Sequence, residues 1–562
     1  MASHGGIPAT FSEGLENKEG HLNPAISSFR NFGVLGPVPL NDVFTGYGSA
    51  DETHAILTKL VARMAEPYRF PDGTPAIPDD DDNDKIPAGF TYLAQLAAHD
   101  LVQSVGPAAS LRARLGTENL RTRPLILDTI YGGGPAVEEA AFVLPAPRRE
   151  SRSLFRLGRV AGTGQAGGEG ECAKPLFRDL PRVRAKLASD ASEVGQDSLP
   201  DVLIADPRND NNAIIGQLTV LFKLLHNAIV KDLDKGNPLT PLEEFRIFAR
   251  ARRTVVCAYR SVLRHHLLER LLKPEVYAEY CGNGWQPIVD PEPGPTDERL
   301  PVEFAHAAFR LGHAMIRHAY RMRPGADRFG IYDVIRTSSS RRPGSMPITE
   351  AWVVQWSQFF ELDSEGPQLS RRISPSYTST LLSKSLFPAG DPIADRPVDP
   401  VRSGLLYRDL LRSSVSRLRR LKPLVDDLPD KIREQSPLLN LSDDERTEKL
   451  AAWLGAGATA FTSAELEKLS REPPLTFYLL FEAAHECNGQ HFGTLGSVIV
   501  GDIFCGALRL TRDLVEAVED PETGESAEQL LESVFANRRP AMGDLIRLAA
   551  SGLPDEQEVP LV

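Results

Sequence analysis

The sequence predicts a mainly α fold, one large helical domain with very few short strands, from three observations. Apolar residues recur at spacings of three and four along many segments, which is the pattern of amphipathic helices. Runs in which β-branched and polar residues alternate are scarce and short. No internal repeat of constant period is visible in the 562 residues, which argues against a solenoid of stacked repeats.

The N-terminal part is the first element along the chain. Residues 1–86 are rich in Gly, Pro and Asp and close with the acidic run PDDDDNDKIP. We interpret them as an arm or extension that wraps on the body, which leaves 87–562 as the main domain. The acidic run lacks the Gly and the distant Glu of an EF-hand loop, so we interpret it as a solvated linker.

Helical patterns follow. One surrounds His99 in AQLAAHDL, residues 94–101, and others lie in GQLTVLFKLLHNAIVKDL at 216–233 and PVEFAHAAFRLGHAMIRHAYRM at 301–322. We predict a helix for each of these segments. Further helices are expected over 240–273, 404–422, 443–455, 475–488 and 526–550.

Composition limits the function classes. The net charge of -13 argues against nucleic acid or an anionic membrane as a partner. No window approaches about 18 uninterrupted apolar residues, and the first residues have neither a basic nor an apolar leader region. We therefore expect no membrane span, and a protein that is cytoplasmic or exported without a classical signal peptide. The five cysteines show no CxxC spacing and no HExxH occurs, so neither a zinc site nor a disulfide framework is indicated.

Two histidines stand out. The apolar stripe around His99 indicates that its ring faces a core, where a hydrogen-bonded structural histidine is the ordinary interpretation. In the predicted helix 301–322, His313 shares its side with Arg310, Ile316 and Arg317. An imidazole flanked by guanidinium groups suits a haem, because the iron takes a neutral nitrogen and the macrocycle's carboxylates need cations. A surface stripe would explain the second pattern without a cofactor.

Three segments in a fixed order resemble the haem-site motifs of the animal-type haem peroxidases, the peroxidase–cyclooxygenase superfamily, in its bacterial branch. They are AQLAAHDL, ADPRNDNNAIIGQLTVLFKLLHN and FRLGHAMIR, with 18 residues from Arg208 to His226. The likeness runs from about residue 88 to about 510. It includes NLRTRPLILDTIYGGGP, similar to the family's calcium loop, and PLTFYLLFEAAHECNGQHFGTLGSVIVGDIF, similar to the closing helices of the branch.

The resemblance implies a role for each motif residue. His99 is the distal histidine, Gln95 is its companion one helical turn earlier, Arg208 is the distal arginine and His313 is the proximal iron ligand. A neutral imidazole can move a proton from one peroxide oxygen to the other. A guanidinium stabilises the charge that develops on the leaving oxygen. The implied activity is reduction of hydrogen peroxide via a ferryl intermediate, with oxidation of small organic donors, halides or thiocyanate.

Further positions follow from the same resemblance. Arg310 resembles the family's propionate-pairing arginine, whereas fatty-acid-oxygenating members have a radical-forming tyrosine there, which disfavours a dioxygenase mechanism. The family also has an asparagine that accepts the N–H of the proximal histidine, in a segment similar to SGLLYRDLLR. The best register puts Asp409 at that place, and a slip of one residue puts Arg408 there. A carboxylate partner would make the imidazole more anionic and lower the reduction potential.

The sequence departs from the mammalian members at the haem links. Those members form two esters, from an Asp directly before the distal His and a Glu three residues after the distal Arg. Ala98 and Asn211 hold these positions here, and Asn212 stands where mammalian myeloperoxidase has its sulfonium-forming methionine. We therefore expect a haem b without covalent links, which oxidises chloride less readily than the mammalian enzymes do.

A calcium ion is also implied by the resemblance. Asp100, Thr122, Pro124 and Asp128 would contribute to its site, but Ile126 replaces one carboxylate of the family. Calcium takes about six to eight oxygen ligands, so the missing charge weakens the site. Without the ion, Asp100 would need backbone N–H groups or a cation, because a lone buried carboxylate is costly.

The leading hypothesis is a haem peroxidase that acts on hydrogen peroxide, with a role in the response to oxidative stress. A fatty-acid dioxygenase of the same superfamily, with Tyr320 or Tyr407 as its radical residue, is one alternative. A catalytically silent helical binding protein that kept the fold is the other. The electron donor, the halide preference and the oligomeric state are left open by the sequence.

Overall fold

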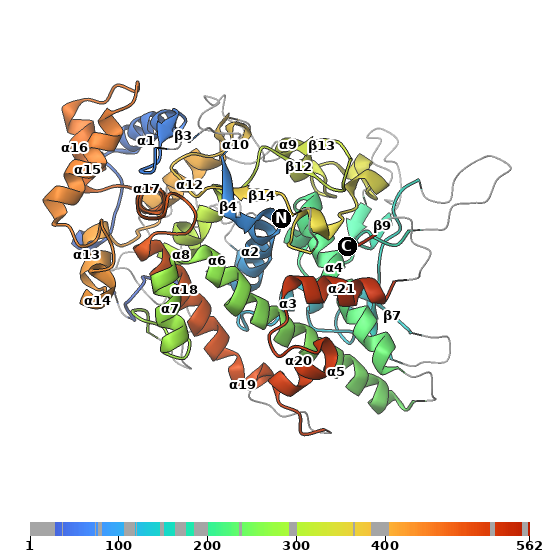
Figure 1. Ribbon diagram of the computed structural model, residues 1–562. Coiled ribbons are helices and arrows are strands. Elements are labelled where there is room, and N and C mark those ends of the chain that lie inside the picture. Colours follow the sequence, from blue (N-terminus) through green and yellow to red (C-terminus); the bar gives the residue numbers. More distant parts are fainter. Residues whose placement is uncertain are drawn as a thin grey trace.

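The computed structural model describes residues 29–35, 37–73, 75–76, 81–105, 118–119, 121–145, 151–162, 176–184, 200–234, 239–291, 300–362, 366–383, 404–516, 523–553 and 560–562. These ranges are mainly helical (Figure 1), which confirms the predicted fold class. Within them, the strands pair only in two-stranded ladders. No extended sheet therefore organises the described part of the chain, and its core is built by helices.

The strand ladders are short. One is parallel, between β1 Phe29–Arg30 and β11 Leu300–Pro301. The others are antiparallel: β2 Tyr68–Arg69 with β3 Pro75–Ala76, β4 Asp82–Pro87 with β14 Leu369–Arg371, β5 Ser104–Val105 with β6 Glu118–Asn119, β7 Phe142–Val143 with β8 Leu154–Phe155, β9 Arg182–Arg184 with β10 Pro200–Val202, and β12 Ala319–Arg321 with β13 Arg328–Gly330.

The helices agree with most of the predicted segments. Those that match are α2 Ala88–Leu101, α4 Ala213–Leu233, α15 Asp443–Gly455 and α17 Leu475–Cys487. The segment 240–273 is one rod of α5 Pro241–Val262, a π-helical turn η7 Leu263–Leu267 and α6 Leu268–Leu271. The remaining helices are α1 Ala50–Met64, α3 Asp128–Tyr131, α7 Pro274–Gly282, α8 Val302–His306, α9 Ile331–Arg336, α10 Ser379–Ser383, α12 Leu405–Val415, α13 Leu421–Asp426, α14 Asp430–Arg433, α16 Ser463–Arg471, α18 Thr494–Leu510, α19 Arg512–Val515, α20 Ala527–Phe535 and α21 Met542–Ser551.

Helix α4 lies in the centre of the core. The side chain of Asn212 caps its first turn by accepting the N–H of Ile215, and the predicted apolar positions Leu218, Leu221 and Leu225 are buried. Helices α5 and α21 pack against α4, and Figure 1 shows α21 lying across it. By length and composition α4 is also the one helix of the described residues that could cross a membrane, but its apolar stretch is wholly buried inside the protein. The described residues thus give no clear membrane span.

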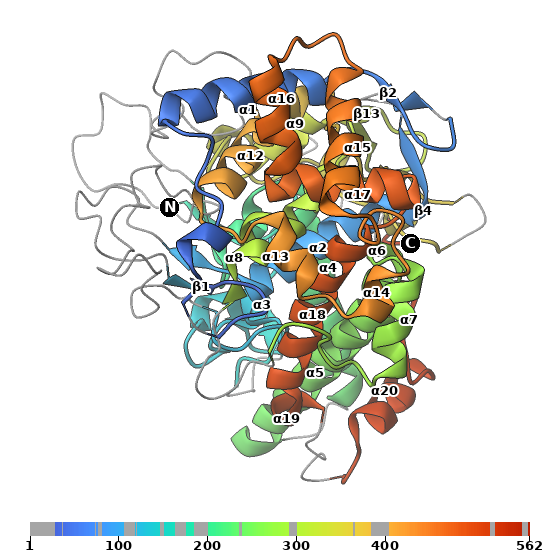
Figure 2. The same ribbon diagram turned by 90° about the vertical axis from the view of Figure 1, so that its left-hand side faces the viewer.

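The described part of the predicted arm packs against the C-terminal half of the chain. Figure 2 shows α1 lying over α12, α15 and α16. Lys59 of α1 pairs with Glu465 at 2.7 Å, and Arg63 donates to the carbonyl of Trp453. Residues 1–28, 36, 74 and 77–80 of the arm lie outside the described residues.

Three predicted helices have a different form. The helix predicted over 404–422 is interrupted, because α12 ends at Val415, Arg417 has a left-handed backbone with φ 55°, and α13 begins only at Leu421. The segment 526–550 is divided into α20 and α21, because Ala536 has a left-handed backbone with φ 52° and Pro540 follows it. The continuous helix predicted over 301–322 is wrong: α8 ends at Ala307, whose φ of -137° and ψ of -74° leave the helical region. Residues Ala308–His313 then form a 3-10 helix, η8.

Candidate active site

One cavity of about 240 Å³ brings the main predicted site residues together. It lies between α2, the 3-10 turn η6 Pro207–Asp210, α8, η8, α9 and α12. Its lining includes six residues that the sequence indicated: Gln95, His99, Arg208, Arg310, His313 and Asp409. The imidazoles of His99 and His313, from distant parts of the chain, therefore border the same space, together with that of His306.

His99 lies on α2 and is 1% exposed. Burial, together with the charge of Arg208, lowers its pKa from 6.5 to about 4. The ring is therefore neutral at neutral pH, with one N–H and one lone pair. Which nitrogen carries the proton is decided by the hydrogen-bond partner of Nδ1.

That partner is Asn209, which the sequence analysis did not single out. The Nδ2 of Asn209 donates to the carbonyl of Thr129 at 3.0 Å, and its Oδ1 therefore faces His99 Nδ1, at 2.9 Å. An amide oxygen only accepts, so His99 Nδ1 carries the proton and Nε2 carries the lone pair. Nε2 is thus the nitrogen that can take a proton from a ligand in the cavity.

Arg208 borders the cavity but is held by the protein. Its guanidinium forms a two-point ion pair with Asp206, with Nη2 at 2.6 Å from Oδ2 and Nε at 3.0 Å from Oδ1. Burial alone would raise the pKa of Asp206, but its hydrogen bonds and ion pair with Arg208 keep that pKa well below its usual range. Arg208 also donates to the carbonyls of His99, at 2.7 Å, and Val102. The arginine therefore fixes the end of α2 that carries the histidine.

Gln95, Ala98, Asn211 and Asn212 complete the same side of the cavity. The Oε1 of Gln95 accepts a hydrogen bond from Asn212 at 3.2 Å, which leaves its Nε2 as the donor group. Ala98 and Asn211 occupy the two positions where the mammalian enzymes form esters. Both border the cavity, and neither side chain can form such a link.

His313 borders the cavity from η8. Residues i and i+3 of a 3-10 helix eclipse, so Arg310 and His313 lie on one side. The Nδ1 of His313 lies 2.7 Å from Asp409 Oδ2, and the Nη1 of Arg310 lies 3.1 Å from Asp409 Oδ1. The register with Asp409, rather than Arg408, is the one found in the structure. Arg317, expected on the same side, instead pairs with Asp82 and contacts the carbonyl of Leu369.

The carboxylate of Asp409 has three donors. Besides His313 and Arg310, the hydroxyl of Tyr377 donates to Oδ2 at 3.0 Å, a contact that the sequence did not indicate. Burial tends to raise the pKa of Asp409, but the charges and hydrogen bonds of these partners outweigh it and lower the pKa. Asp409 is therefore ionised, and His313 Nδ1 is its N–H donor. The Nε2 of His313 remains for a metal.

The donor set of the cavity fits a haem. Arg341, Arg408 and Arg412 also border the cavity. The sequence analysis did not indicate Arg341 and Arg412, and it considered Arg408 only as the alternative partner of His313. Burial lowers the pKa of Arg341 to about 10, and in the described part of the chain its guanidinium has the carbonyl of Ile335 but no carboxylate as partner. A haem carboxylate would supply the missing charge. Arg408 and Arg412 are four residues apart and so share one helical face, a pattern that the sequence contains. Arg341 lies in a loop, where no such pattern exists.

The carboxylates expected at the calcium site have protein partners in the structure. Both oxygens of Asp100 accept backbone N–H groups, from Leu127 at 2.8 Å and Thr129 at 3.2 Å. Asp128 pairs with Arg123 and Arg252, each at 2.9 Å. Within the described residues, no group of three or more His, Cys, Asp or Glu side chains could hold a metal. The alternative partner for Asp100, backbone N–H groups, is the one found.

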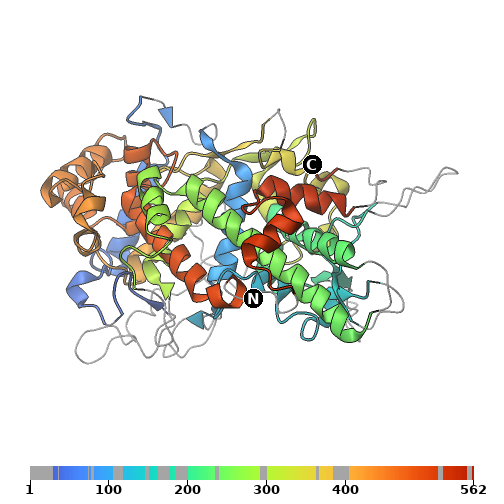
Figure 3. The same ribbon diagram turned by 60° about the horizontal axis from the view of Figure 1, so that its bottom comes forward.

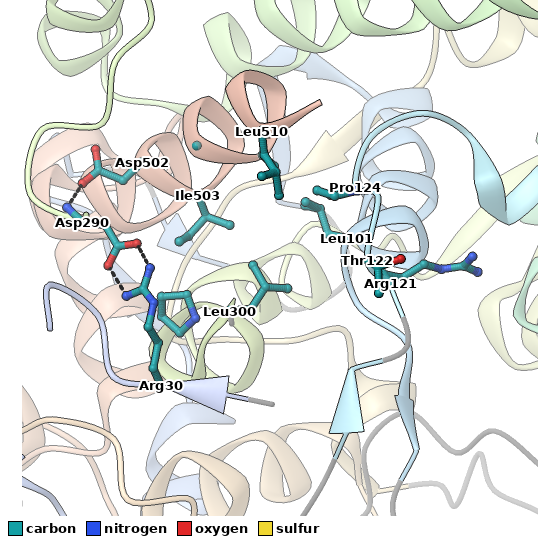
Figure 4. Close-up of a pocket in the computed structure, with 13 residues that line it drawn as sticks. Arg30, Leu101, Arg121, Thr122, Pro124, Asp290, Leu300, Asp502, Ile503 and Leu510 are labelled. Carbon is teal, nitrogen blue, oxygen red and sulfur yellow. Dashed lines mark hydrogen bonds and ion pairs between the residues drawn. The ribbon is translucent and has the colours of Figure 1, made fainter. Parts of the chain in front are cut away.

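Thr122 and Pro124 line a different pocket from the candidate haem cavity. Figure 4 shows both beside Leu101 at a separate small pocket that also contains the ion pair of Arg30 and Asp290. The carbonyl of Pro124 already accepts the hydroxyl of Thr511 at 3.1 Å.

Comparison with known proteins indicates a family and a fold. The sequence model of the family "Animal haem peroxidase" matches residues 174–371, which include Arg208 and His313. The crystal structure of a fatty acid alpha-dioxygenase from Oryza sativa matches with a TM-score of 0.54 and 13% identity, covering 98% of this chain and 87% of that chain. A structure of a variant of the rice enzyme with palmitic acid gives a TM-score of 0.50 and 13% identity over 88% and 79%.

Peroxidase A from Dictyostelium discoideum has 13% identity and a TM-score of 0.44, covering 86% of this chain and 94% of that chain. At this level of identity, the solved structures show the shared fold alone. No curated protein matches the sequence.

Proposed function

We propose that this chain is a haem peroxidase of the peroxidase–cyclooxygenase superfamily, which reduces hydrogen peroxide and oxidises small organic donors, halides or thiocyanate. One observation carries the proposal. A neutral imidazole with its lone pair on Nε2, His99, borders the same cavity as an imidazole whose Nδ1 is held by a carboxylate, His313. The first arrangement suits a base, and the second suits a metal ligand.

A bound haem would supply the redox chemistry of this reaction. His313 would ligate its iron through Nε2, and Arg341, Arg408 and Arg412 would pair with its carboxylates, a role that the sequence gave to Arg310. Arg310 is occupied by Asp409 instead. Ala98 and Asn211 border the cavity at the two ester positions, and neither side chain can form an ester. We therefore propose a haem b without ester links. No calcium ion forms part of the proposal.

The proton chemistry belongs to His99. Its Nε2 takes the proton of hydrogen peroxide in the cavity and returns it to the oxygen that leaves as water. The hydrogen bond from Nδ1 to Asn209 keeps the tautomer that this step needs. Arg208 holds the backbone carbonyls of His99 and Val102 and shares its charge with Asp206. We therefore propose that it positions α2, with a smaller direct effect on the leaving oxygen than a free guanidinium would have.

A fatty-acid dioxygenase is the second candidate, because the structures with the same fold include such enzymes. The radical tyrosine of that mechanism would have to border the cavity. Tyr320 and Tyr407 do not: the hydroxyl of Tyr320 accepts the N–H of Arg317 at 2.9 Å, and that of Tyr407 contacts His54. Among the described residues, the tyrosine in the cavity lining is Tyr92.

One experiment separates these functions. The full-length protein is purified with haem supplied, its visible spectrum is recorded, and peroxide is added with guaiacol, bromide, iodide or thiocyanate as donor. We expect a haem-bound spectrum and peroxide-dependent oxidation of at least one donor. Oxygen uptake with linoleate or palmitate in the absence of peroxide, abolished in Tyr92→Phe, would establish the dioxygenase instead. A protein that binds no haem would contradict both.

A further inference from the structure

A second cleft lies apart from the haem cavity. Its volume is about 510 Å³, and α5, η7, α18, α19 and α20 contribute most of its lining. It shares no residue with the haem cavity. Figure 1 shows α19 and α20 beside the lower end of α5, and Figure 3 shows the same helices from below. Nothing in the proposed peroxidase reaction uses this cleft.

The cleft concentrates positive charge in a chain whose net charge is -13. Its cationic lining residues are Arg264, Arg509, Arg512, Arg538 and Arg539. Two carboxylates face them, Glu516 and Glu528. Glu516 is already shared by Arg260, at 2.6 Å, and Arg264, at 2.9 Å.

Two of the five arginines, Arg512 and Arg539, differ from the others in their ion pairs. Arg538 pairs with Glu532 at 2.8 Å, and Glu528 adds to the negative charge around it. Arg512 and Arg539 have no carboxylate partner among the residues that the structure describes. Burial and the nearby charges of Arg539 and Arg264 lower the pKa of His265 to about 4, which indicates that the positive groups converge there. An anion in the cleft would relieve this repulsion.

The floor of the cleft contains groups that fit a ligand. Ser261, 6% exposed, has a hydroxyl oxygen without a hydrogen-bond partner in the described structure. The π-helical turn η7 interrupts the α5–α6 rod just where Arg264 and His265 enter the lining, and such turns are frequent at functional sites. The half-buried indole of Trp285 stands edge-on to His265, with ring centroids 5.6 Å apart. A hydroxyl donor, guanidinium groups and an aromatic ring thus border one space.

We propose that this cleft binds a diphosphate group, either as free pyrophosphate or as part of a nucleoside diphosphate. Guanidinium groups bind phosphate through two parallel hydrogen bonds, and two groups without a protein carboxylate match the two phosphates. The hydroxyl of Ser261 gives a further donor. The ring of Trp285 offers a face to a base if the diphosphate belongs to a nucleotide.

Calorimetric titration of the full-length protein with pyrophosphate at low ionic strength tests the site. We expect binding, and binding that is at least about tenfold weaker in the double variant Arg512→Gln/Arg539→Gln, because a hydrogen bond to a charged group contributes about that factor. Arg328→Gln is the matched control: Arg328 is an exposed arginine of β13, outside the cleft, and its variant should bind as the unchanged protein does. Melting temperatures verify that each variant is folded.

Titrations with adenosine diphosphate and with adenosine identify the source of the phosphates. Adenosine diphosphate that binds more tightly than pyrophosphate, with the difference lost in Trp285→Leu, would identify a nucleotide. Equal affinities would identify free pyrophosphate. The proposal is overturned if neither compound binds at millimolar concentration, if the double variant binds as the unchanged protein does, or if adenosine alone accounts for the affinity. These results are independent of peroxidase activity.

Discussion

The two histidines of the haem cavity are the same residue type in opposite surroundings. His99 is 1% exposed and its Nδ1 faces the amide oxygen of Asn209. The side chain of His313 is 30% exposed, and its Nδ1 faces the carboxylate of Asp409. A neutral acceptor leaves the first ring a neutral base, whereas an anionic acceptor strengthens the second as a ligand. The charge of the partner, rather than the histidine itself, separates the two roles.

The largest effect is expected from removing His313, the proposed iron ligand. In His313→Ala the iron would lose its protein nitrogen, so we expect loss of the haem spectrum of the unchanged protein and of nearly all peroxidase activity. Visible spectra before and after addition of imidazole measure this, because free imidazole can enter the space left by the side chain. His318→Ala, at an exposed histidine, is the control. A variant that kept both spectrum and activity would refute the assignment of His313.

Removal of the base should leave the cofactor in place. In His99→Ala we expect an unchanged haem content but a rate of reaction with peroxide lower by about 10²–10⁴-fold, the usual contribution of a positioned acid–base group. Stopped-flow mixing with peroxide gives the rate, and the haem absorbance gives the loading. If His99→Ala also lost its haem, the division of roles between His99 and His313 would be wrong.

The pH dependence tests why His99 is a base. Its pKa of about 4 predicts that kcat/KM for peroxide is constant from neutral pH downward and falls only as pH approaches 4. The same depressed pKa means that the neutral ring stabilises the fold above pH 6.5, and that this stability is lost as pH falls toward 4. In Asn209→Asp, a carboxylate beside Nδ1 would raise the pKa, so the fall should begin at a higher pH. If the fall of kcat/KM at low pH began at the same pH in Asn209→Asp, a group other than His99 would control it.

Substitutions around His313 should change the reduction potential of the haem iron. In Asp409→Asn, the imidazole of His313 would be less anionic, so we expect the Fe(III)/Fe(II) midpoint potential to rise by several tens of millivolts. For a one-electron couple, about 59 mV corresponds to a tenfold change in the equilibrium constant. Tyr377→Phe should move it the other way by a smaller amount, because Tyr377 now donates to the same carboxylate oxygen as His313. Potentiometric titration measures both, and shifts of equal sign would contradict this arrangement.

The sequence was sufficient for the parts of the site that depend on motifs. Helices α2 and α4 follow from their apolar spacing, and the resemblance placed His99, Arg208 and His313, which border one cavity. The partners of these residues were less accessible. Asn209 and Asp206 lie inside a recognised motif, yet their contacts arise only when η6 folds against α2.

Other features depend on long-range contacts that no local pattern contains. The continuous helix expected over 301–322 ends at Ala307, and the tighter η8 aligns Arg310 with His313. Arg310 then reaches Asp409, 99 residues further along the chain, instead of a free edge of the cofactor. Arg341 enters the cavity from a loop without periodicity. In each case a tertiary partner, rather than residue type, decides the role.

The smallest effect is expected from calcium. Asp100 and Asp128 have backbone N–H groups and arginines as partners, so a chelator such as EDTA should leave the melting temperature unchanged, and added calcium should not raise it. Arg121 ties this segment to the site instead, because its Nε donates to the carbonyl of His99 at 3.1 Å and its Nη2 pairs with Asp206. Arg121→Gln should therefore lower both the melting temperature and the rate with peroxide, with no recovery on addition of calcium. Recovery by calcium would show that the ion, rather than the arginine, holds the segment.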